Sequence, residues 1–279
     1  MSTTGPVQDM IEERRKQKLA AFNKLKELFR NKIELKRPVF FVPGWTDESC
    51  ANWTQSFKLS PSIKDWFKKT SSNCEMVNFV TFTEQESIGC NSFIDFGLIL
   101  KKKVESAIGN KKLFDIVGHS MGGLDIRTAI AMHDLECVEN CITVATPHKG
   151  SQLGEIGPIF MKYKPQHKIQ CINLDPDHLP VQTINSLQNR KKFLEKVKKL
   201  YQFVGTRDMA VARNAKIDTR SISSASLDKI ITVEIGGVTH SANGGITRDV
   251  RVIIAIFNAL MGIEPEKPKY NYGYIIKRV

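Results

Sequence analysis

The sequence lacks any apolar run that approaches the ~20 residues needed to cross a membrane. It has no C-x-x-C pair, no zinc-like spacing of cysteines with histidines, and no internal repeat or low-complexity tract. We therefore expect its six cysteines to be reduced thiols and the protein to use neither a metal nor an organic cofactor. The N-terminal region is charged from Glu12 onward and lacks the apolar stretch of a signal peptide. A cytoplasmic protein is the expectation, although a secreted mature form looks the same.

The charge of the chain is unbalanced towards the positive sign. It contains 41 Lys and Arg against 29 Asp and Glu, a formal net charge of +12 at pH 7. Residues 1–37 carry 10 basic against 5 acidic residues and 148–200 carry 10 against 4, whereas 38–147 carry 10 against 13. Such an excess fits an anionic lipid surface, an acidic partner or a solvated basic surface. Nucleic-acid binding is disfavoured, because no stretch interleaves basic residues with exposed aromatic ones.

Apolar segments of strand length alternate with segments of helical spacing along the chain. The expected strands are 37–42, 75–82, 113–118, 140–146, 200–205 and 229–237, and the expected helices include 92–109, 120–133 and 247–261. The strands are continuously apolar rather than alternating, so both faces of the sheet must be covered. This pattern predicts a doubly wound α/β fold with a mainly parallel sheet.

Two further segments define the domain organisation. Residues 8–34 have helical spacing, which predicts a helix with Phe22, Leu25, Phe29 and Ile33 on one face. Residues 148–199 contain no clear core strand, and a structureless loop of that length is uncommon. They predict an inserted cap with a helix near 181–199 and room for another at 152–163. The expected division is an N-terminal extension at 1–36, a catalytic core at 37–147 and 200–265, a cap at 148–199 and a C-terminal tail at 266–279.

The segment Gly118-His119-Ser120-Met121-Gly122 fits the pattern G-x-S-x-G. It follows an apolar strand and opens a helix, and such a turn forces its serine into a strained backbone while the glycines let strand and helix approach. This context predicts Ser120 as a nucleophile rather than a serine in an ordinary turn. His119 lies within the turn and is expected to point away.

A serine hydroxyl is a weak nucleophile and needs a base that is held by an acid. In this arrangement the acid and then the base follow strands that come after the nucleophile. His240, in the loop "GGVTHSANGG", is the only histidine late enough in the chain and is the expected base. Asp208 directly follows strand 200–205 and is the expected acid, with Asp218 and Asp228 further along the same connection as alternatives.

The oxyanion that forms during attack needs preorganised N–H donors. The backbone N–H of Met121, at the start of the helix after the nucleophile, is one expected donor. The second is the N–H of Trp45 in "FVPGW", because Gly44 lets the loop after the first strand turn closely.

Five segments together resemble the lipase/esterase branch of the α/β-hydrolase fold superfamily: "FFVPGW", "DIVGHSMGGLDIR", "TVATPHKGS", "FVGTRDMAV" and "GVTHSANGG". The resemblance extends over about residues 37–262. It implies that Ser120, Asp208 and His240 form a catalytic triad, that Trp45 and Met121 form the oxyanion hole, and that "ATPHKGS" leads into a lid. The chain departs from the family at Pro43-Gly44, where a His-Gly pair is usual, and residues 1–36 have no evident counterpart.

These motifs are less specific for the substrate than for the fold. One group of residues forms either an apolar acyl site or, for its cap members, the cap's own small core: Trp45, Leu153, Ile156, Ile159, Phe160 and Met161. A basic, apolar-lined lid suits an ester presented at a lipid–water interface. We expect a lipase or carboxylesterase that works through an acyl-enzyme. The alternatives are an acyltransferase or thioesterase with the same triad, and a binding protein, which has no need for serine, acid and histidine together.

Overall fold

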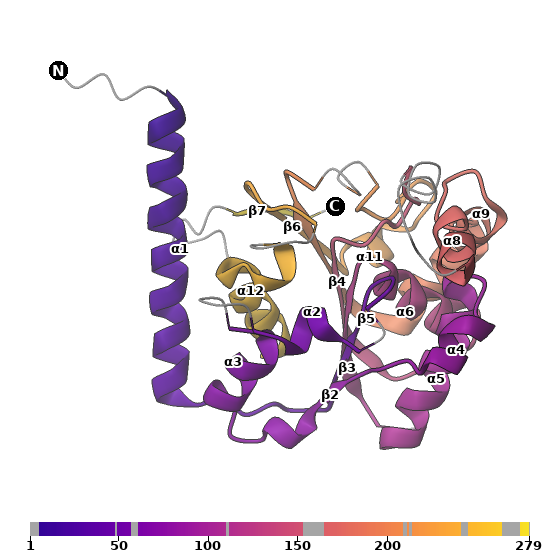
Figure 1. The fold of residues 1–279 in the computed structure, drawn as a ribbon, viewed down its shortest axis with the longest axis horizontal. Helices are drawn as coiled ribbons and strands as arrows, with labels where there is room; N and C mark the ends of the chain where they lie inside the picture. Colours follow the sequence, from indigo (N-terminus) through magenta and orange to yellow (C-terminus); the bar gives the residue numbers. More distant parts are fainter. Residues whose placement is uncertain are drawn as a thin grey trace.

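The strands that the structure describes lie in one sheet. A computed structural model describes residues 6–47, 49–56, 61–109, 112–152, 165–208, 211, 214–240, 245–263 and 274–278. Its strands are β1 Val39–Val42, β2 Val77–Phe79, β3 Phe114–His119, β4 Val138–Val144, β5 Val197–Gly205, β6 Ile230–Ile235 and β7 Tyr274–Arg278. They lie in the order β2-β1-β3-β4-β5-β6-β7 (Figure 1). All neighbours pair in parallel except β6 and β7, so the mainly parallel sheet predicted from the sequence is confirmed.

Helices cover both faces of this sheet (Figure 1). One layer contains α1 Pro6–Asn31, α2 Ala51–Thr54, α3 Ile63–Thr70 and α12 Val250–Leu260. The other contains α4 Glu84–Gly89, α5 Phe93–Ile108, α6 Met121–Ala131, α8 Pro165–Ile172, α9 Leu179–Ile184 and α10 Leu187–Lys196. Short elements are α11 Ser224–Leu227 and the 3-10 turns Cys74–Met76 and Ile246–Arg248. The doubly wound architecture follows from these two layers.

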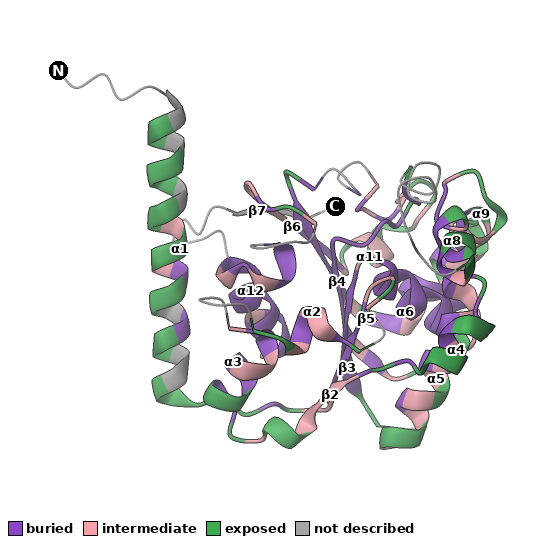
Figure 2. Ribbon diagram, in the orientation of Figure 1, coloured by how far each residue is buried: buried purple, intermediate pink, exposed green. Residues whose placement is uncertain are grey.

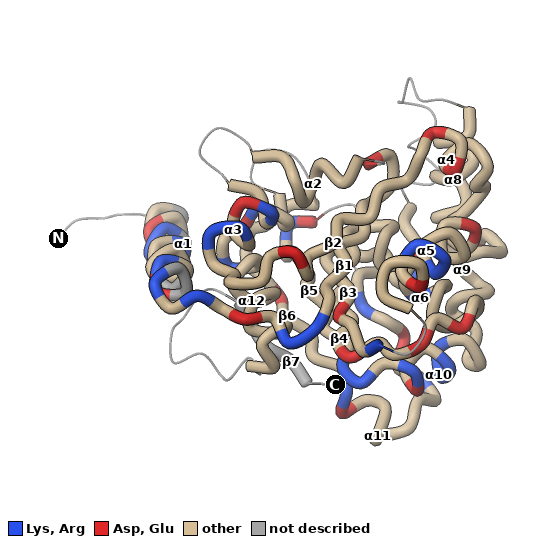
Figure 3. The backbone as a smooth tube through the Cα atoms, turned by 90° about the horizontal axis from the view of Figure 1, so that it is seen from below, with Lys and Arg blue, Asp and Glu red and all other residues tan. Residues whose placement is uncertain are grey.

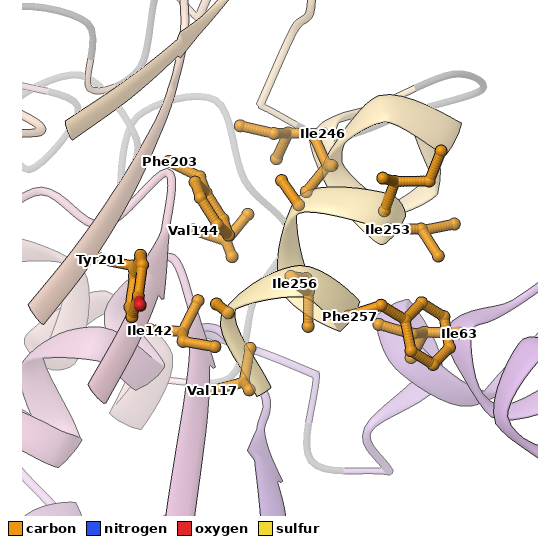
Figure 4. Packing of buried hydrophobic residues seen from close by; sticks show 14 of the residues in the cluster. Ile63, Val117, Ile142, Val144, Tyr201, Phe203, Ile246, Ile253, Ile256 and Phe257 are labelled. Carbon is orange, nitrogen blue, oxygen red and sulfur yellow. The ribbon is translucent and has the colours of Figure 1, made fainter. Parts of the chain in front are cut away.

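The burial of strand β1 explains why the strand is apolar at every position. Val39 and Phe41 belong to a core cluster that includes α12, whereas Phe40 and Val42 belong to a second cluster that includes α5 and α6. Successive side chains of a strand point to opposite faces, so a strand between two helical layers buries every residue. Figure 4 shows the first cluster, in which side chains of α12 meet those of β3, β4 and β5.

Helix α1 packs on the domain through its C-terminal half. Ala21 and Leu25 are fully buried, whereas Leu19 is 60% exposed, and the N-terminal half projects past the rest of the molecule (Figures 1 and 2). The helix ends earlier than the sequence suggested. Lys32 has a positive φ of 41°, and Ile33 instead forms a bridge with Ser71.

The segment 148–199 differs from expectation at its C-terminal end. Helix α10 packs against α6 and leads into β5, so residues 197–199 form strand where a helix was expected. Six of the basic residues of this segment lie at 190–199, on α10 and the first residues of β5 (Figure 3). The amino end of a parallel strand is opposite the edge where Asp208 follows β5. Lys198 and Lys199, at the start of β5, therefore lie away from that edge, and a basic lid over the site stays a prediction.

The expected C-terminal tail contains β7, which the sequence analysis did not predict. It pairs antiparallel with β6, from Ile235↔Tyr274 to Ile231↔Arg278. Among the helices that the structure describes, none combines the length and the apolar character needed to span a membrane.

The packing of α1 predicts a contrast between two leucines of the same helix. We expect Leu25→Ala to lower the free energy of unfolding by about 2–5 kcal/mol, because it opens a cavity in a filled core. Leu19→Ala should change it by less than about 0.5 kcal/mol, since that side chain is largely solvated. Urea unfolding of both variants measures this. Equal, small effects would show that α1 does not pack on the domain.

Candidate active site

Ser120 occupies the sharp turn between β3 and α6. Its backbone dihedrals are φ 53° and ψ −127°, a region that non-glycine residues adopt at a cost of about 1–3 kcal/mol. The Ser120 N–H donates to the carbonyl of Val144 over 2.9 Å, and its own carbonyl accepts from Gly123 N over 3.1 Å. The strained turn is thus tied to the end of β4 on one side and to the first turn of α6 on the other.

Two glycines allow neighbouring loops to approach this turn. A Cβ at Gly122 would lie 2.1 Å from the carbonyl oxygen of Pro43, and a Cβ at Gly123 would lie 2.0 Å from Oγ1 of Thr146. Any larger residue would therefore push away the loop after β1 or the loop after β4. Both loops are held against the start of the helix that follows the serine.

The structure brings together the three residues predicted as a triad. His240 Nε2 lies 2.8 Å from Ser120 Oγ, and His240 Nδ1 lies 2.9 Å from Asp208 Oδ2. With the ring proton on Nδ1, the imidazole donates to the buried Asp208 carboxylate and accepts from the serine hydroxyl. Asp208 also accepts from the N–H of Val211 over 3.2 Å. Ser120, Asp208 and His240 come after the carboxyl ends of β3, β5 and β6, respectively. In a parallel sheet these ends lie at the same edge.

The alternative acids lie elsewhere. Asp218 accepts a hydrogen bond from Arg220 Nη2 over 2.8 Å and pairs with Arg190 over 3.5 Å. The bond from Arg220 holds the pKa of Asp218 well below its usual range. Asp228 is exposed at the end of α11. Neither hydrogen-bonds His240 in the described part of the chain, so the choice of Asp208 among the three agrees with the geometry.

The loop predicted to carry an oxyanion donor lies beside Ser120. A Cβ at Gly44 would lie 3.0 Å from the Cβ of Ser120, and Trp45 is the next residue. The loop is braced because Asp47 N donates to the Gly44 carbonyl over 3.1 Å, and the Asp47 carboxylate accepts from two N–H groups of α2 at 2.7 and 2.9 Å. Met121 is the first residue of α6, where backbone N–H groups have no acceptor within the helix.

His119 does not point away from the site as expected. Its Nε2 lies 3.3 Å from the carbonyl oxygen of His240, and the two ring centroids are 5.1 Å apart. Trp53 packs edge-on against its other side, with centroids 6.0 Å apart. Burial lowers the pKa of His119 to about 3, so the ring is neutral, and with its proton on Nε2 it donates to that carbonyl. No local sequence signal reveals this contact with a residue 121 positions away.

A buried arginine joins α6 to the loop after β4 and to α9. Arg127 Nη1 donates to the carbonyl of His148, and its Nη2 donates to the carbonyl of Ile184 in α9, each over 3.0 Å. Burial lowers the pKa of Arg127 to about 9 and that of His148 well below its ordinary value. The His148 ring also lies 3.0 Å from the Thr143 hydroxyl. The "ATPHKGS" loop is thus fixed to both α6 and α9.

The remaining predicted site residues lie partly outside the described chain. Leu153, Ile156, Ile159, Phe160 and Met161 all fall there, so the expected acyl site stays a prediction. Trp45 is half-buried and packs against the α5 and α6 side of the core. Among the described residues, no three His, Cys, Asp or Glu side chains gather as a metal site requires.

Comparisons with known proteins identify relatives of the sequence and of the fold. Residues 38–212 match the family described as palmitoyl protein thioesterase, a range that includes Ser120 and Asp208 and ends before His240. A search of curated proteins finds no match. The mature lipase BlEst2 of Bacillus licheniformis is similar in structure, with 17% identity, a TM-score of 0.57, and coverage of 82% of this chain and 92% of the lipase.

Two other solved structures agree with this fold. Phospholipase PlaB of Legionella pneumophila has 14% identity and a TM-score of 0.57, over 80% of this chain and 59% of that chain. The lin2722 gene product of Listeria innocua has 13% identity and a TM-score of 0.54, over 85% and 99%. At such identities the likeness concerns the fold alone, and it is the α/β-hydrolase fold expected from the motifs.

The contact between the two histidines predicts a change in serine reactivity. His119→Phe keeps a ring against His240 but removes the hydrogen bond to its carbonyl, worth about 1 kcal/mol. We expect labelling of Ser120 by a fluorophosphonate to slow by roughly threefold to tenfold, as one such bond allows. The control is His133→Phe, since the His133 ring also bonds a backbone carbonyl, that of Ile94 at 2.9 Å, away from the site. Equal labelling rates would contradict the prediction.

Proposed function

The chain belongs to the palmitoyl protein thioesterase family, and from this premise we propose that it hydrolyses acyl esters through a covalent acyl-enzyme on Ser120. The observation that carries the proposal is the continuous pair of hydrogen bonds from Ser120 Oγ through His240 to Asp208. A buried carboxylate that orients an imidazole next to a serine hydroxyl is the arrangement that activates a weak nucleophile.

The proposed reaction has two steps. In the first, His240 Nε2 takes the hydroxyl proton as Ser120 Oγ attacks the acyl carbonyl carbon, and the imidazolium then protonates the leaving group. In the second, His240 takes a proton from water, the resulting hydroxide attacks the acyl-enzyme, and the returned proton restores Ser120 as the acid departs. Asp208 keeps the ring in the productive tautomer and stabilises the imidazolium, without itself taking the proton.

We propose that the carbonyl oxygen is stabilised by the backbone N–H groups of Met121 and Trp45. Negative charge develops on this oxygen in the tetrahedral intermediate, and donors already in place stabilise it without reorganisation. The first turn of α6 adds the positive end of its helix dipole. The close approach of Gly44 to Ser120 and the bracing of its loop support this assignment.

Two classes of substrate, which differ in their leaving group, are candidates for this site. An oxygen ester, as cleaved by a lipase or carboxylesterase, is our first choice from the motifs of the sequence. An acyl thioester is the second candidate, because the matched family is described as a thioesterase. The same triad serves both, since the acyl half of the substrate is identical. We place the proposed cap before α10, in the part of the chain that α8 and α9 anchor to the core.

Matched substrates separate these two candidates. We expect hydrolysis of an oxygen ester and of the thioester with the same acyl chain, and a larger kcat/KM for one of them identifies the leaving group. Ser120→Ala should reduce kcat for both by about a millionfold, the scale for loss of a serine nucleophile. Steady-state assays over short to long acyl chains measure this. Unchanged hydrolysis in Ser120→Ala would reject the proposed mechanism.

The acid is tested by a pair of aspartates. Asp208→Ala should lower kcat by about 10⁴-fold, because His240 loses the partner that fixes its tautomer and stabilises its charge. Asp218→Ala should leave kcat close to that of the wild type, since Asp218 bonds arginines and not the imidazole. Loss of activity in Asp218→Ala with retention in Asp208→Ala would reassign the acid. Circular dichroism of both variants checks that they fold.

A further inference from the structure

A carboxylic acid that the proposed mechanism does not use lies in the second turn of α6. The side chain of Asp125 is buried, with 1% of the residue exposed, and its Oδ1 accepts no hydrogen bond from any group in the described residues. Burial raises the pKa of Asp125 well above its usual range. Burial thus favours the protonated form, in which the carboxyl carries one O–H donor besides its acceptor oxygens.

This carboxyl adjoins a small cavity of about 10 Å³. A space of this size accommodates a single water molecule when it has polar groups in its wall. The wall brings together parts of the protein that are distant in sequence. Besides Asp125 and two phenylalanines, the lining residues are Gly44 and Thr46 of the loop after β1, Met121 of α6, Ser87 of α4 and Gln170 of α8.

We propose that this cavity binds one water molecule, through which Asp125 holds the loop of Gly44 to Thr46 in position beside Met121. The O–H of the acid donates a hydrogen bond to the water, and the water in turn donates hydrogen bonds to oxygen atoms in the wall, to which the hydroxyls of Thr46 and Ser87 contribute. Two to four such partners are what a buried water requires. This arrangement also satisfies a carboxyl that otherwise loses its hydrogen bonds on burial, which is costly.

The position of the cavity relates it to the chemistry of the site. Gly44 immediately precedes Trp45, and Met121 carries the other backbone N–H that we assign to the oxyanion. A water bonded between α6 and this loop therefore sets the distance between the two donors. Asp125 is a positioning residue and does not touch the substrate. The inference rests on the proposed function.

The packing around the cavity disfavours an acyl chain as its occupant. The rings of Phe82 and Phe96 close part of the wall, 4.9 Å apart and edge to face. Gln170 closes another part, where its amide donates to the carbonyls of Ser87 and Cys90, each over 3.0 Å. A space bounded in this way holds one water but no run of methylene groups.

Two substitutions of similar size test the role of the acid. Asp125→Asn keeps a neutral group that donates and accepts hydrogen bonds, whereas Asp125→Leu fills the space without either. We expect Asp125→Leu to lower kcat by about tenfold to a hundredfold, somewhat less than the loss of an oxyanion donor itself, with KM within about twofold. Asp125→Asn should recover most of that loss. The control is Asp228→Asn on the surface, which should match the wild type.

The acyl-chain series distinguishes the water from a substrate pocket. If Asp125→Leu lowers kcat by the same factor for every chain length, the cavity acts on the oxyanion loop. A shift in the preferred chain length would instead make the cavity part of the acyl site and overturn the proposal. Equal kcat losses in Asp125→Asn and Asp125→Leu would also overturn it, because only hydrogen bonding separates the two.

Two measurements on the resting protein remain informative if Asp125→Leu does not fold or no ester is turned over. The infrared difference spectrum of wild type minus Asp125→Asn should contain the C=O band of a protonated carboxylic acid at neutral pH. A high-resolution crystal structure should show an ordered water between Asp125 and Thr46. A carboxylate band, or a direct bond from Asp125 to a protein group without water, would overturn the proposal independently of the fate of the proposed function.

Discussion

The strained backbone of Ser120 is the constraint on which the rest of the site depends. A left-handed φ at a serine is unfavourable, so its surroundings must enforce it. They do so by close packing, with the carbonyl of Pro43 on one side of α6 and the side chain of Thr146 on the other. The loop after β1, the loop after β4 and the start of α6 are consequently fixed relative to one another, and the serine hydroxyl meets His240 at hydrogen-bond distance.

Burial determines the charge of the polar groups around this turn. His119 and His148 are neutral because the interior disfavours their charged forms, so neither places a positive charge beside His240. The two terminal nitrogens of the buried Arg127 guanidinium donate to backbone carbonyls of the loop after β4 and of α9. A fully buried α6 thus starts directly after Ser120 and is bonded to α9, and Figure 2 shows how completely it is enclosed.

The parallel strands and the meeting of Ser120, His240 and Asp208 were predictable because both depend on short patterns in the chain. Continuous apolar runs indicate strands covered on both faces, and the turn of Ser120 lies between such a strand and a helix. Chain order then selects His240, and the end of β5 selects Asp208. The contact of His119 with the carbonyl of His240 was not predictable, since it depends on a loop that arrives 121 residues later.

The prediction of element boundaries failed where the local sequence pattern was ambiguous. The sequence around Val197 is rich in lysine and fits an amphipathic helix, and only pairing with Val138 of β4 makes it a strand. Strand β7 was missed for a related reason, because it pairs with β6, from which α12 separates it along the chain. The start of the short helix α3 is set by Ser62, whose side chain accepts from Asp65 N, and a hydrophobic pattern does not register such a contact.

The separation of Ser120 and His240 by 120 residues has a consequence for how the protein acquires its chemistry. Contacts between distant parts of a chain form late, because closing a long loop costs entropy before any contact repays it. The strained turn of Ser120 needs β3, α6 and the loops after β1 and β4, whereas the hydrogen bonds from Ser120 through His240 to Asp208 also need β5 and β6 to dock. Recovery of a reactive serine during refolding is therefore a late event, and it reports that the whole sheet has assembled.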